Sequence, residues 1–504
     1  MARARASVAR LTLAGRRGKQ GGMIDIRPVA NIVGKVVVTL GAAMALPMLV
    51  DWWHGDPHWL IFLECGILTT LAGGLVALST RQVDKSLTIQ QVFLLTAMLW
   101  LVVPVAGALP FMLGAPHVGF TDAYFEAMSG VTTTGTTAFP DLDNLPKGTN
   151  LWRAFLNWAG GLGIIVVAMI FLPAMKVGGM QFFRSEGFDT LGKILPRAFD
   201  IAREMTGVYI AMTASCMVVY ILLGMKGFDA LVLALSTCST GGFSNYDASF
   251  APFIGPAEYA AAFFMILASI PFIRMVQLIR GSAEPIWRDI QVRAYLRWTF
   301  YAIAVVVLYR LLWLEAKNPL DVIRETTFNV VSTFSGTGFA STDVTQWGHF
   351  PFVILIVVGL IGGCTGSTSC SVKVFRYLVL FQAVKAQLRR MQSPHRVFPL
   401  LYGGRPLEED VVDSVMAFFT LFILSFGLLI VGLALTGLHP RTALTAAWTA
   451  IANVGVVWGP ELTPEGAVTD FPTASKWLMI WGMYLGRLEL ISVLVLFLPR
   501  FWRS

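Results

Sequence analysis

The segment Ser129-Gly-Val-Thr-Thr-Thr-Gly135 has three counterparts later in the chain. They are Ser236-Thr-Cys-Ser-Thr-Gly-Gly242, Ser332-Thr-Phe-Ser-Gly-Thr-Gly338 and Thr449-Ala-Ile-Ala-Asn-Val-Gly455. Each runs from a hydroxyl residue to a glycine, and all four align without a gap. Because internal repeats reveal one structural unit used several times, the sequence predicts four copies of a single unit.

The surroundings of these segments repeat as well. Each has a long apolar span, a short amphipathic helix such as 121–129 or 321–332, the glycine segment and a second long span. A helix needs about 20 apolar residues to cross a bilayer. The long spans are predicted at 92–113, 151–173, 205–225, 259–274, 298–314, 352–376, 412–436 and 476–499. We therefore expect an all-α polytopic membrane protein with two N-terminal helices and four pseudo-symmetric helix–pore loop–helix repeats around a central ion pore.

The domain boundaries follow from this arrangement. We expect a basic cytoplasmic leader at 1–22, with Met1 and Met23 both possible as the start. The remaining units are two N-terminal transmembrane helices (23–90), repeat 1 (91–175), repeat 2 with a preceding cytoplasmic linker (176–280), repeat 3 with a gate loop (281–376), and a cytoplasmic linker with repeat 4 (377–504).

Composition supports a membrane protein. Of the 504 residues, 56% are hydrophobic and 13% charged, and the mean hydropathy is +0.67, which is too apolar for a soluble domain. The net charge of +8 could indicate nucleic-acid binding. However, the basic residues cluster in the connections 176–203, 274–297 and 373–405, as in cytoplasmic loops. Both termini are then predicted to be cytoplasmic.

No enzyme motif is found. The five cysteines lack metal-type spacing, and the chain contains neither His-Glu-x-x-His nor Gly-x-Ser-x-Gly. We therefore expect no cofactor and no metal site other than an ion in the pore. A membrane-embedded enzyme remains a distant alternative.

The glycine segments suit cation coordination. Non-helical backbone at membrane depth must be buried in protein or line a water-filled path, and four such segments around one axis satisfy this together. Rings of backbone carbonyls can replace the hydration shell of an ion, and glycine permits the required backbone angles. The short helices would direct their partially negative C-terminal ends at the axis. The alternative is four unrelated exterior loops rich in turn residues.

Several motifs give the chain a specific resemblance. It resembles the Trk/Ktr potassium transporter superfamily and, within it, the TrkH-type membrane subunit. The matching motifs are Asp25-Ile-Arg-Pro-Val29, Thr132-Thr-Thr-Gly135, Asn157-Trp-Ala-Gly-Gly-Leu-Gly163, Gly178-Gly-Met-Gln181, Ser239-Thr-Gly-Gly-Phe-Ser244, Thr337-Gly-Phe339, Gly362-Gly-Cys-Thr-Gly-Ser367 and Gly486-Arg-Leu-Glu489.

The resemblance implies a potassium uptake function in a bacterial inner membrane. It implies a homodimer with one pore per subunit and a cytoplasmic nucleotide-binding regulatory subunit of the TrkA type. The filter residues it implies are Thr133, Thr134, Gly135, Thr240, Gly241, Gly242, Gly336, Thr337, Gly338, Asn453, Val454 and Gly455. The gate residues it implies are Gly362, Gly363, Gly366, Ser367, Ser369, Ser371 and Arg487.

The sequence itself adds to the gate hypothesis. Residues 362–371 interrupt a long helix with small residues, as ion paths do, and they lack the Gly-Lys-Ser/Thr ending of an ATP-binding loop. Arg487 lies in the span 476–499, where an arginine costs about 2.5–3.5 kcal/mol unless it faces water or a partner. We expect it to face the pore; snorkelling or a structural pair with Glu489 is the alternative. Lys373 and Arg376 are interpreted as cytoplasmic topology signals, with a role in coupling as the alternative.

Two departures from the family pattern stand out. The fourth repeat reads Asn453-Val-Gly-Val-Val-Trp-Gly-Pro460, so its filter contribution is expected to be the weakest. The gate hinge reads Thr368-Ser-Cys-Ser-Val372 where glycines are common, which predicts a stiffer backbone. A sodium-permeable or sodium-coupled transporter is an open alternative, as is proton-coupled symport.

Overall fold

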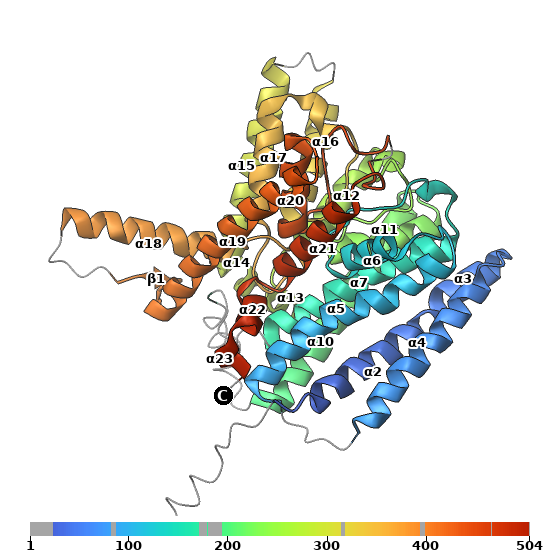
Figure 1. Cartoon of the computed structure of the whole chain (residues 1–504). Coiled ribbons are helices and arrows are strands. Elements are labelled where there is room, and N and C mark those ends of the chain that lie inside the picture. The colour runs from blue at the N-terminus through green and yellow to red at the C-terminus, as the bar shows by residue number, and fades with distance from the viewer. Residues whose placement is uncertain are drawn as a thin grey trace, which may run out of the picture.

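The computed structural model of this chain describes residues 24–81, 87–170, 179, 194–313, 318–393, 399–464 and 466–502. Helices make up nearly all of this part of the chain (Figure 1). One short antiparallel hairpin joins β1 (Leu401–Tyr402) to β2 (Arg405–Pro406). The predicted all-α polytopic membrane fold is confirmed. The leader 1–22 and the motif Gly178-Gly-Met-Gln181, apart from Gly179, lie outside the described residues.

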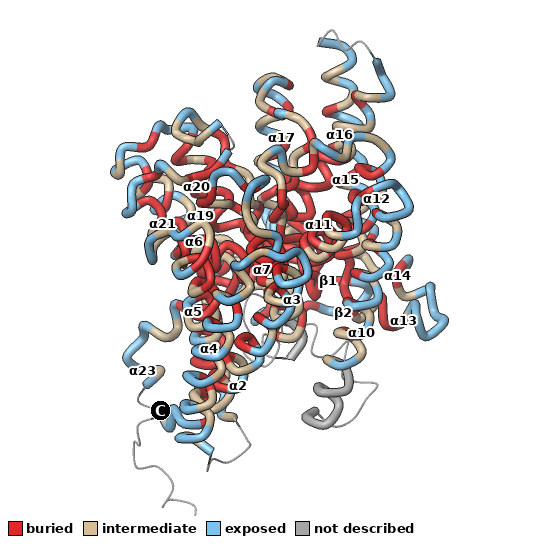
Figure 2. The backbone as a smooth tube through the Cα atoms, turned by 90° about the vertical axis from the view of Figure 1, so that its right-hand side faces the viewer, coloured by how far each residue is buried: buried red, intermediate tan, exposed pale blue. Residues whose placement is uncertain are grey.

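The helices divide into an apolar shell and a polar centre. Six described helices are long and apolar enough to cross a membrane, and two sharply bent helix pairs raise this number to eight. Their outer faces carry exposed apolar side chains such as Leu71, Leu75 and Leu428, which a bilayer would cover. The buried residues gather in the middle of the molecule, where the short helices meet (Figure 2).

The N-terminal part is a helical hairpin beside the repeats. It consists of α2 (Arg27–Ala43), α3 (Ala45–His54), which continues the same span, and α4 (Trp59–Ser79). α2 and α4 pack very closely through glycines. A Cβ on Gly73 would lie 2.7 Å from the carbonyl oxygen of Gly34, and a Cβ on Gly34 would lie 2.8 Å from that of Gly73. Small residues of this kind let two membrane helices approach backbone to backbone.

Each repeat contains a long helix, a short helix, a non-helical segment and a second helix. Repeat 1 has α5 (Ile89–Leu113), α6 (Phe120–Val131) and α7 (Lys147–Ile170); repeat 2 has α10 (Ile194–Leu222), α11 (Gly227–Ser239) and α12 (Pro256–Ala268); repeat 3 has α15 (Ile290–Trp313), α16 (Pro319–Ser335) and α17 (His349–Ile361); repeat 4 has α19 (Glu409–Leu435), α20 (Pro440–Ala452) and α21 (Thr473–Arg487).

The connections carry the remaining elements. These are η1 (Leu142–Asn144), η2 (Ala251–Phe253), α13 (Phe272–Ile279), α14 (Glu284–Arg288), η3 (Val344–Trp347), α18 (Val374–Gln392), α22 (Ile491–Leu494), η4 (Val495–Phe497) and α23 (Pro499–Trp502). α18 projects away from the body of the molecule beside the small hairpin (Figure 1).

Local chemistry sets the ends of the short helices. α16 begins with Pro319, whose missing N–H costs nothing at this position, and the side chain of Asn318 accepts a hydrogen bond from the Leu320 N–H at 3.1 Å. A left-handed residue ends three of these helices. These residues are Thr240 after α11, Gly336 after α16 and Asn453 after α20.

Two predicted continuous spans are wrong. The span 259–274 breaks between α12 and α13, whose axes differ by 101°, because Pro271 has no N–H to continue a helix. The span 476–499 breaks after α21, and the chain turns by 103°. Glu489 and Leu490 have φ values of +58° and +20°, outside the helical region.

The glycine contact between α2 and α4 yields a test with a neighbouring control. Gly73→Val places a side chain against the Gly34 backbone, and overpacking of this kind costs about 1–3 kcal/mol. We expect a lower melting temperature of the purified protein in detergent. Gly74→Val has open space around its Cβ and should leave the melting temperature unchanged. Equal melting temperatures for the two variants would contradict the packing.

Candidate ion pore

The four repeat glycines form a closed ring. We call residues 132–138, 239–245, 335–341 and 452–458 filter segments 1 to 4. A Cβ added to each ring glycine would strike the carbonyl oxygen just before the glycine of the next segment, so the backbones are in direct contact. The distance from the added Cβ to this oxygen would be 2.3 Å for Gly135 and Gly241 O, 2.0 Å for Gly242 and Thr337 O, 1.9 Å for Gly338 and Val454 O, and 2.4 Å for Gly455 and Thr134 O. The fourth step returns to segment 1, which closes the circle.

The ring has a repeated backbone conformation. The glycines have φ values of +89°, +77°, +80° and +94° in segment order. The residues two positions earlier are left-handed too: Thr133 at +52°, Thr240 at +50°, Gly336 at +79° and Asn453 at +52°. In an ordinary strand successive residues face opposite sides, whereas alternating handedness turns successive carbonyls to one side. Three of the earlier residues are not glycine, so the ring holds strain of about 1–2 kcal/mol at each of them.

The fourth segment takes the same geometry as the others. Gly455 lies in the ring, and Asn453 occupies the equivalent left-handed position. The bulky Trp458 is accommodated outside the ring, where it stacks on Trp448 with 5.4 Å between ring centroids. The larger residues of this segment therefore do not displace its backbone.

In three of the four repeats, the hydroxyl residue that opens the motif braces the filter from behind. Ser129 Oγ donates to the Thr136 carbonyl at 2.6 Å, and Ser332 Oγ donates to the Phe339 carbonyl at 2.7 Å. In segment 4, Thr449 Oγ1 accepts from the Gly455 N–H at 2.6 Å. These bonds fix the strand around the glycine to the short helix before it.

The threonines just before two ring glycines face protein rather than an open axis. The Thr134 hydroxyl lies 2.8 Å from that of Thr132 and accepts a 2.8 Å hydrogen bond from Asn453 Nδ2. The Thr337 hydroxyl lies 2.7 Å from that of Ser335. Bracing is therefore the role these contacts support, and the backbone carbonyls are left for an ion.

The predicted gate loop lies across the C-terminal ends of the short helices. It contacts all four repeats. In repeats 1 and 2, Cys370 Sγ lies 3.7 Å from Thr133 Oγ1, and Thr368 Oγ1 lies 3.3 Å from Thr240 Oγ1. In repeats 3 and 4, a Cβ on Gly336 would lie 3.7 Å from Cys370 N, and Ser371 Oγ donates to the Ala452 carbonyl at 3.0 Å. Because it contacts residues that precede the ring glycine in all four segments, the loop lies at one end of the ring, which we call the inner end.

Internal hydrogen bonds and the broken helix α12–α13 hold this loop. Ser369 Oγ accepts from the Gly363 N–H at 2.8 Å, and Ser367 Oγ donates to the Cys364 carbonyl at 2.6 Å. At the break between α12 and α13, the Phe272 N–H donates to the Gly366 carbonyl at 2.9 Å. Gly362 and Gly366 are left-handed, as is Ser371 at φ +68°.

Arg487 reaches the gate loop from the end of α21. Its side chain is buried, and Nη1 donates to the Thr368 carbonyl at 3.2 Å and contacts Cys370 Sγ. Nη2 lies 3.4 Å from the Gly160 carbonyl of α7. Arg487 thus connects repeat 4, the loop and repeat 1, and it is not paired with Glu489.

Lys373 and Arg376, interpreted from the sequence as topology signals, are buried beside the gate loop. Lys373 is 7% exposed, and its Nζ donates to the Ser369 carbonyl at 2.8 Å. Arg376 is buried, forms an ion pair with Glu489 and lies 3.8 Å from the ring centroid of Phe418. The interpretation as loop charges is therefore corrected. Their place after a helix break could have suggested burial, but the ion-pair partner of Arg376 lies more than a hundred residues away in the sequence.

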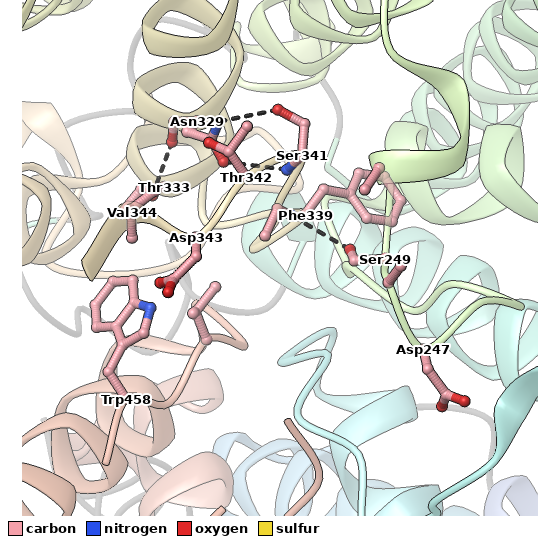
Figure 3. Close-up of a pocket in the computed structure, with 14 residues that line it drawn as sticks. Asp247, Ser249, Asn329, Thr333, Phe339, Ser341, Thr342, Asp343, Val344 and Trp458 are labelled. Carbon is pink, nitrogen blue, oxygen red and sulfur yellow. Dashed lines mark hydrogen bonds between the residues drawn. The ribbon is translucent and has the colours of Figure 1, made fainter. Parts of the chain in front are cut away.

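A cavity of about 320 Å³ opens at the opposite end of the ring from the loop, which we call the outer end (Figure 3). Residues of repeats 2, 3 and 4 line it, including Asp247, Asn329, Asp343 and Trp458. In Figure 3 Asp343 lies beside Trp458, while Asp247 lies on a separate loop. The cavity thus brings two outer carboxylates near the ring entrance.

The two carboxylates differ in their proton affinity. Burial raises the pKa of Asp343, but hydrogen bonds donated by Thr345 and Gln346 outweigh it and lower the pKa. Burial and the neighbouring Asp143 raise the pKa of Asp247, against a hydrogen bond from the Leu142 N–H. Asp247 therefore loses its charge first as the pH falls.

Comparison with known proteins identifies the class of this pore. A TrkH family model, described as a cation transport protein, matches residues 60–504. The Trk system potassium uptake protein TrkI of Halomonas elongata is 36% identical over 479 residues, covering 95% of this chain and 97% of that protein. The Trk system potassium uptake protein TrkH of Escherichia coli K12 is 33% identical over 488 residues, covering 95% of this chain and all of that protein.

A solved structure agrees with the sequence relatives. The crystal structure of the potassium transporter TrkH from Vibrio parahaemolyticus superimposes with a TM-score of 0.88 and 31% identity, covering 95% of this chain and all of that one. The resemblance inferred from the sequence motifs is confirmed, and the relatives are transporters rather than enzymes. This chain belongs to the TrkH family of cation transport proteins.

Proposed function

We propose that this chain conducts potassium into the cell through the ring formed by filter segments 1 to 4. The closed ring of glycine-to-carbonyl contacts carries the proposal, because four carbonyl-bearing segments that meet at one axis can replace the water around a dehydrated ion. The relatives named as potassium uptake proteins support potassium as the ion. In this proposal the residues from Thr133, Thr240, Gly336 and Asn453 to their ring glycines form the ion-binding filter.

The loop 362–371 and Arg487 form the proposed gate. The loop contacts the inner ends of all four repeats, so an ion that leaves the ring inward meets it directly. Arg487 adds a fixed positive charge there and binds the loop through Thr368 and Cys370. Conduction then requires the loop to leave Arg487 and the short-helix ends.

Regulation and assembly are proposed from the family relationship. Trk systems in the relatives' names imply further components, and we infer a cytoplasmic nucleotide-binding partner of the TrkA type that moves the gate loop. The basic residues of the connections 274–297 and 377–405 support an orientation with both termini cytoplasmic. From the family relationship we also infer a homodimer in the bacterial inner membrane.

Sodium permeation and coupled symport are the competing outcomes. Purified protein in planar bilayers under opposed potassium and sodium gradients distinguishes them. A reversal potential that follows the potassium gradient at two pH values supports the proposal. A potential that follows sodium, or one that shifts with the proton gradient, contradicts it.

Glycine at the ring can be tested against a glycine with the same backbone angle elsewhere. In Gly135→Ala the new Cβ would lie 2.3 Å from the Gly241 carbonyl oxygen, so the ring must widen or distort. We expect the potassium-to-sodium permeability ratio to fall by about tenfold or more, equivalent to about 1.4 kcal/mol. Gly437→Ala has φ +95° with open space and should keep the wild-type ratio. An unchanged ratio in Gly135→Ala would contradict the filter assignment.

Ser371 permits a test of the gate. Its hydroxyl ties the loop to the Gly359 carbonyl at 2.5 Å or to the Ala452 carbonyl, and its left-handed backbone is strained. Ser371→Ala removes the tie and keeps the strain, whereas Ser371→Gly removes both. We expect a higher open probability for the alanine variant than for wild type in single-channel records, because the closed loop loses a bond. The glycine variant should open less than the alanine variant; the reverse order would contradict this description.

The outer carboxylates predict a pH dependence. At low ionic strength and limiting potassium, uptake of wild-type protein should fall as acidification neutralises Asp247. Asp247→Asn should lack this acid-side fall, whereas Asp343→Asn should reduce uptake by about two- to fivefold at neutral pH and retain the fall. Rubidium-tracer influx into proteoliposomes measures both effects. Because salt screens exposed charges, both effects on uptake should become smaller at high ionic strength. Effects that do not depend on salt would contradict electrostatic capture of the ion.

A further inference from the structure

We propose that Glu126 and Arg153 form an ionic brace behind filter segments 1 and 2 and thereby determine cation selectivity. This inference rests on the proposed potassium filter. Both are positioning residues, since they contact the filter backbone from behind rather than an ion. Glu126 lies on α6, and Arg153 lies on α7.

The pair is fully enclosed. Arg153 Nε lies 2.7 Å from Glu126 Oε1, with side-chain exposures of 1% and 0%. A buried ion pair recovers its desolvation cost only with good geometry and further hydrogen bonds. What it provides here is a fixed position for the groups that it bonds.

On one side the brace holds segment 1. Glu126 Oε2 accepts a 2.8 Å hydrogen bond from the Ala138 N–H, and both its oxygens accept from the Thr137 hydroxyl at 3.0 and 3.1 Å. Thr137 and Ala138 lie two and three residues after Gly135 in filter segment 1. The carboxylate therefore fixes the backbone just beyond the ring glycine.

On the other side the brace holds segment 2. Arg153 Nη1 donates to the Ser244 carbonyl at 2.7 Å, and the guanidinium lies 4.4 Å from the ring centroid of Phe243. Nη2 donates to the Thr137 hydroxyl at 3.2 Å. Thr137 and Ser244 occupy the same position after their ring glycines. One planar, rigid guanidinium thus sets the spacing between equivalent points of two filter walls.

The other boundaries between filter segments are built without charge. Segments 4 and 1 are joined by Thr136 Oγ1, which donates to the Gly455 carbonyl at 2.9 Å, and segment 3 is joined to repeat 2 by the Phe250 N–H, which donates to the Ala340 carbonyl at 3.0 Å. Within the described residues, Glu126–Arg153 is the one ion pair that bonds a filter segment. Its loss would free one boundary of the ring.

Repeat 3 has an uncharged side chain at the position of Glu126. Asn329 stands where Glu126 stands in repeat 1, and its Oδ1 accepts from the Ser341 N–H at 3.3 Å. An amide at this position is thus compatible with the fold. Glu126→Gln should therefore keep the bond to Ala138 while it loses the ionic contact to Arg153.

The test compares Glu126→Gln and Arg153→Lys with Glu258→Gln. The control breaks another ion pair of a fully buried carboxylate, Glu258–Arg324 at 2.7 Å, which bonds no filter segment. Potassium-to-sodium permeability ratios are taken from reversal potentials, and folding is followed by melting temperature and gel filtration. We expect the ratio to fall about tenfold in Glu126→Gln and less in Arg153→Lys, with the wild-type ratio in Glu258→Gln.

The results distinguish a failure of the ionic brace from a failure of the potassium filter. A folded Glu126→Gln protein with the wild-type ratio overturns the brace and leaves the potassium filter standing, whereas wild-type protein without potassium selectivity overturns the filter itself. If Glu126→Gln does not fold, Thr137→Val replaces it, because it removes the hydroxyl that both charged groups bond and leaves them paired. A wild-type ratio in Thr137→Val then overturns the brace; a two- to fivefold fall supports it.

Discussion

Peptide groups outside a helix at membrane depth need partners, because each unsatisfied group costs several kcal/mol in hydrocarbon. Four filter segments meet this requirement together. Each glycine comes within contact distance of the carbonyl oxygen of the next segment, which is possible only without a Cβ, and hydroxyls on the short helices hold the strands from behind. A single segment of this kind would face hydrocarbon, whereas four segments around one axis are buried in protein or line the path between them.

The same requirement explains the two broken helices. The gate loop also places non-helical backbone inside the membrane, and its Gly366 carbonyl is bonded at the break before α13. Arg487, the last residue of α21, donates to the Thr368 carbonyl at the other break. Helix ends therefore supply the partners that the loop lacks, and the loop can move only if those bonds are replaced.

Sequence patterns predict what is local or repeated. The ring glycines, the loop 362–371 and the all-α architecture follow from spacing and hydropathy. The left-handed Thr133 and Thr240 do not, because the ring imposes their conformation against their preference. The burial of Arg376 depends on Glu489, a partner distant in sequence. A carboxylate such as Glu126 within a short apolar helix was a usable signal, but its arginine could be found only in three dimensions.

The pseudo-symmetry of the ring extends to the backbone and not to its supports. All four segments share the two left-handed positions. However, the Glu126–Arg153 ion pair joins segments 1 and 2, and the Thr136 hydroxyl joins segments 4 and 1. Among the described residues no hydrogen bond joins segments 3 and 4, and the outer cavity opens between them. Ion coordination requires equal carbonyl geometry and therefore constrains the backbone. The supports face protein or the entrance and are free to differ, so changes behind one wall can alter selectivity or ion capture while the ring is preserved.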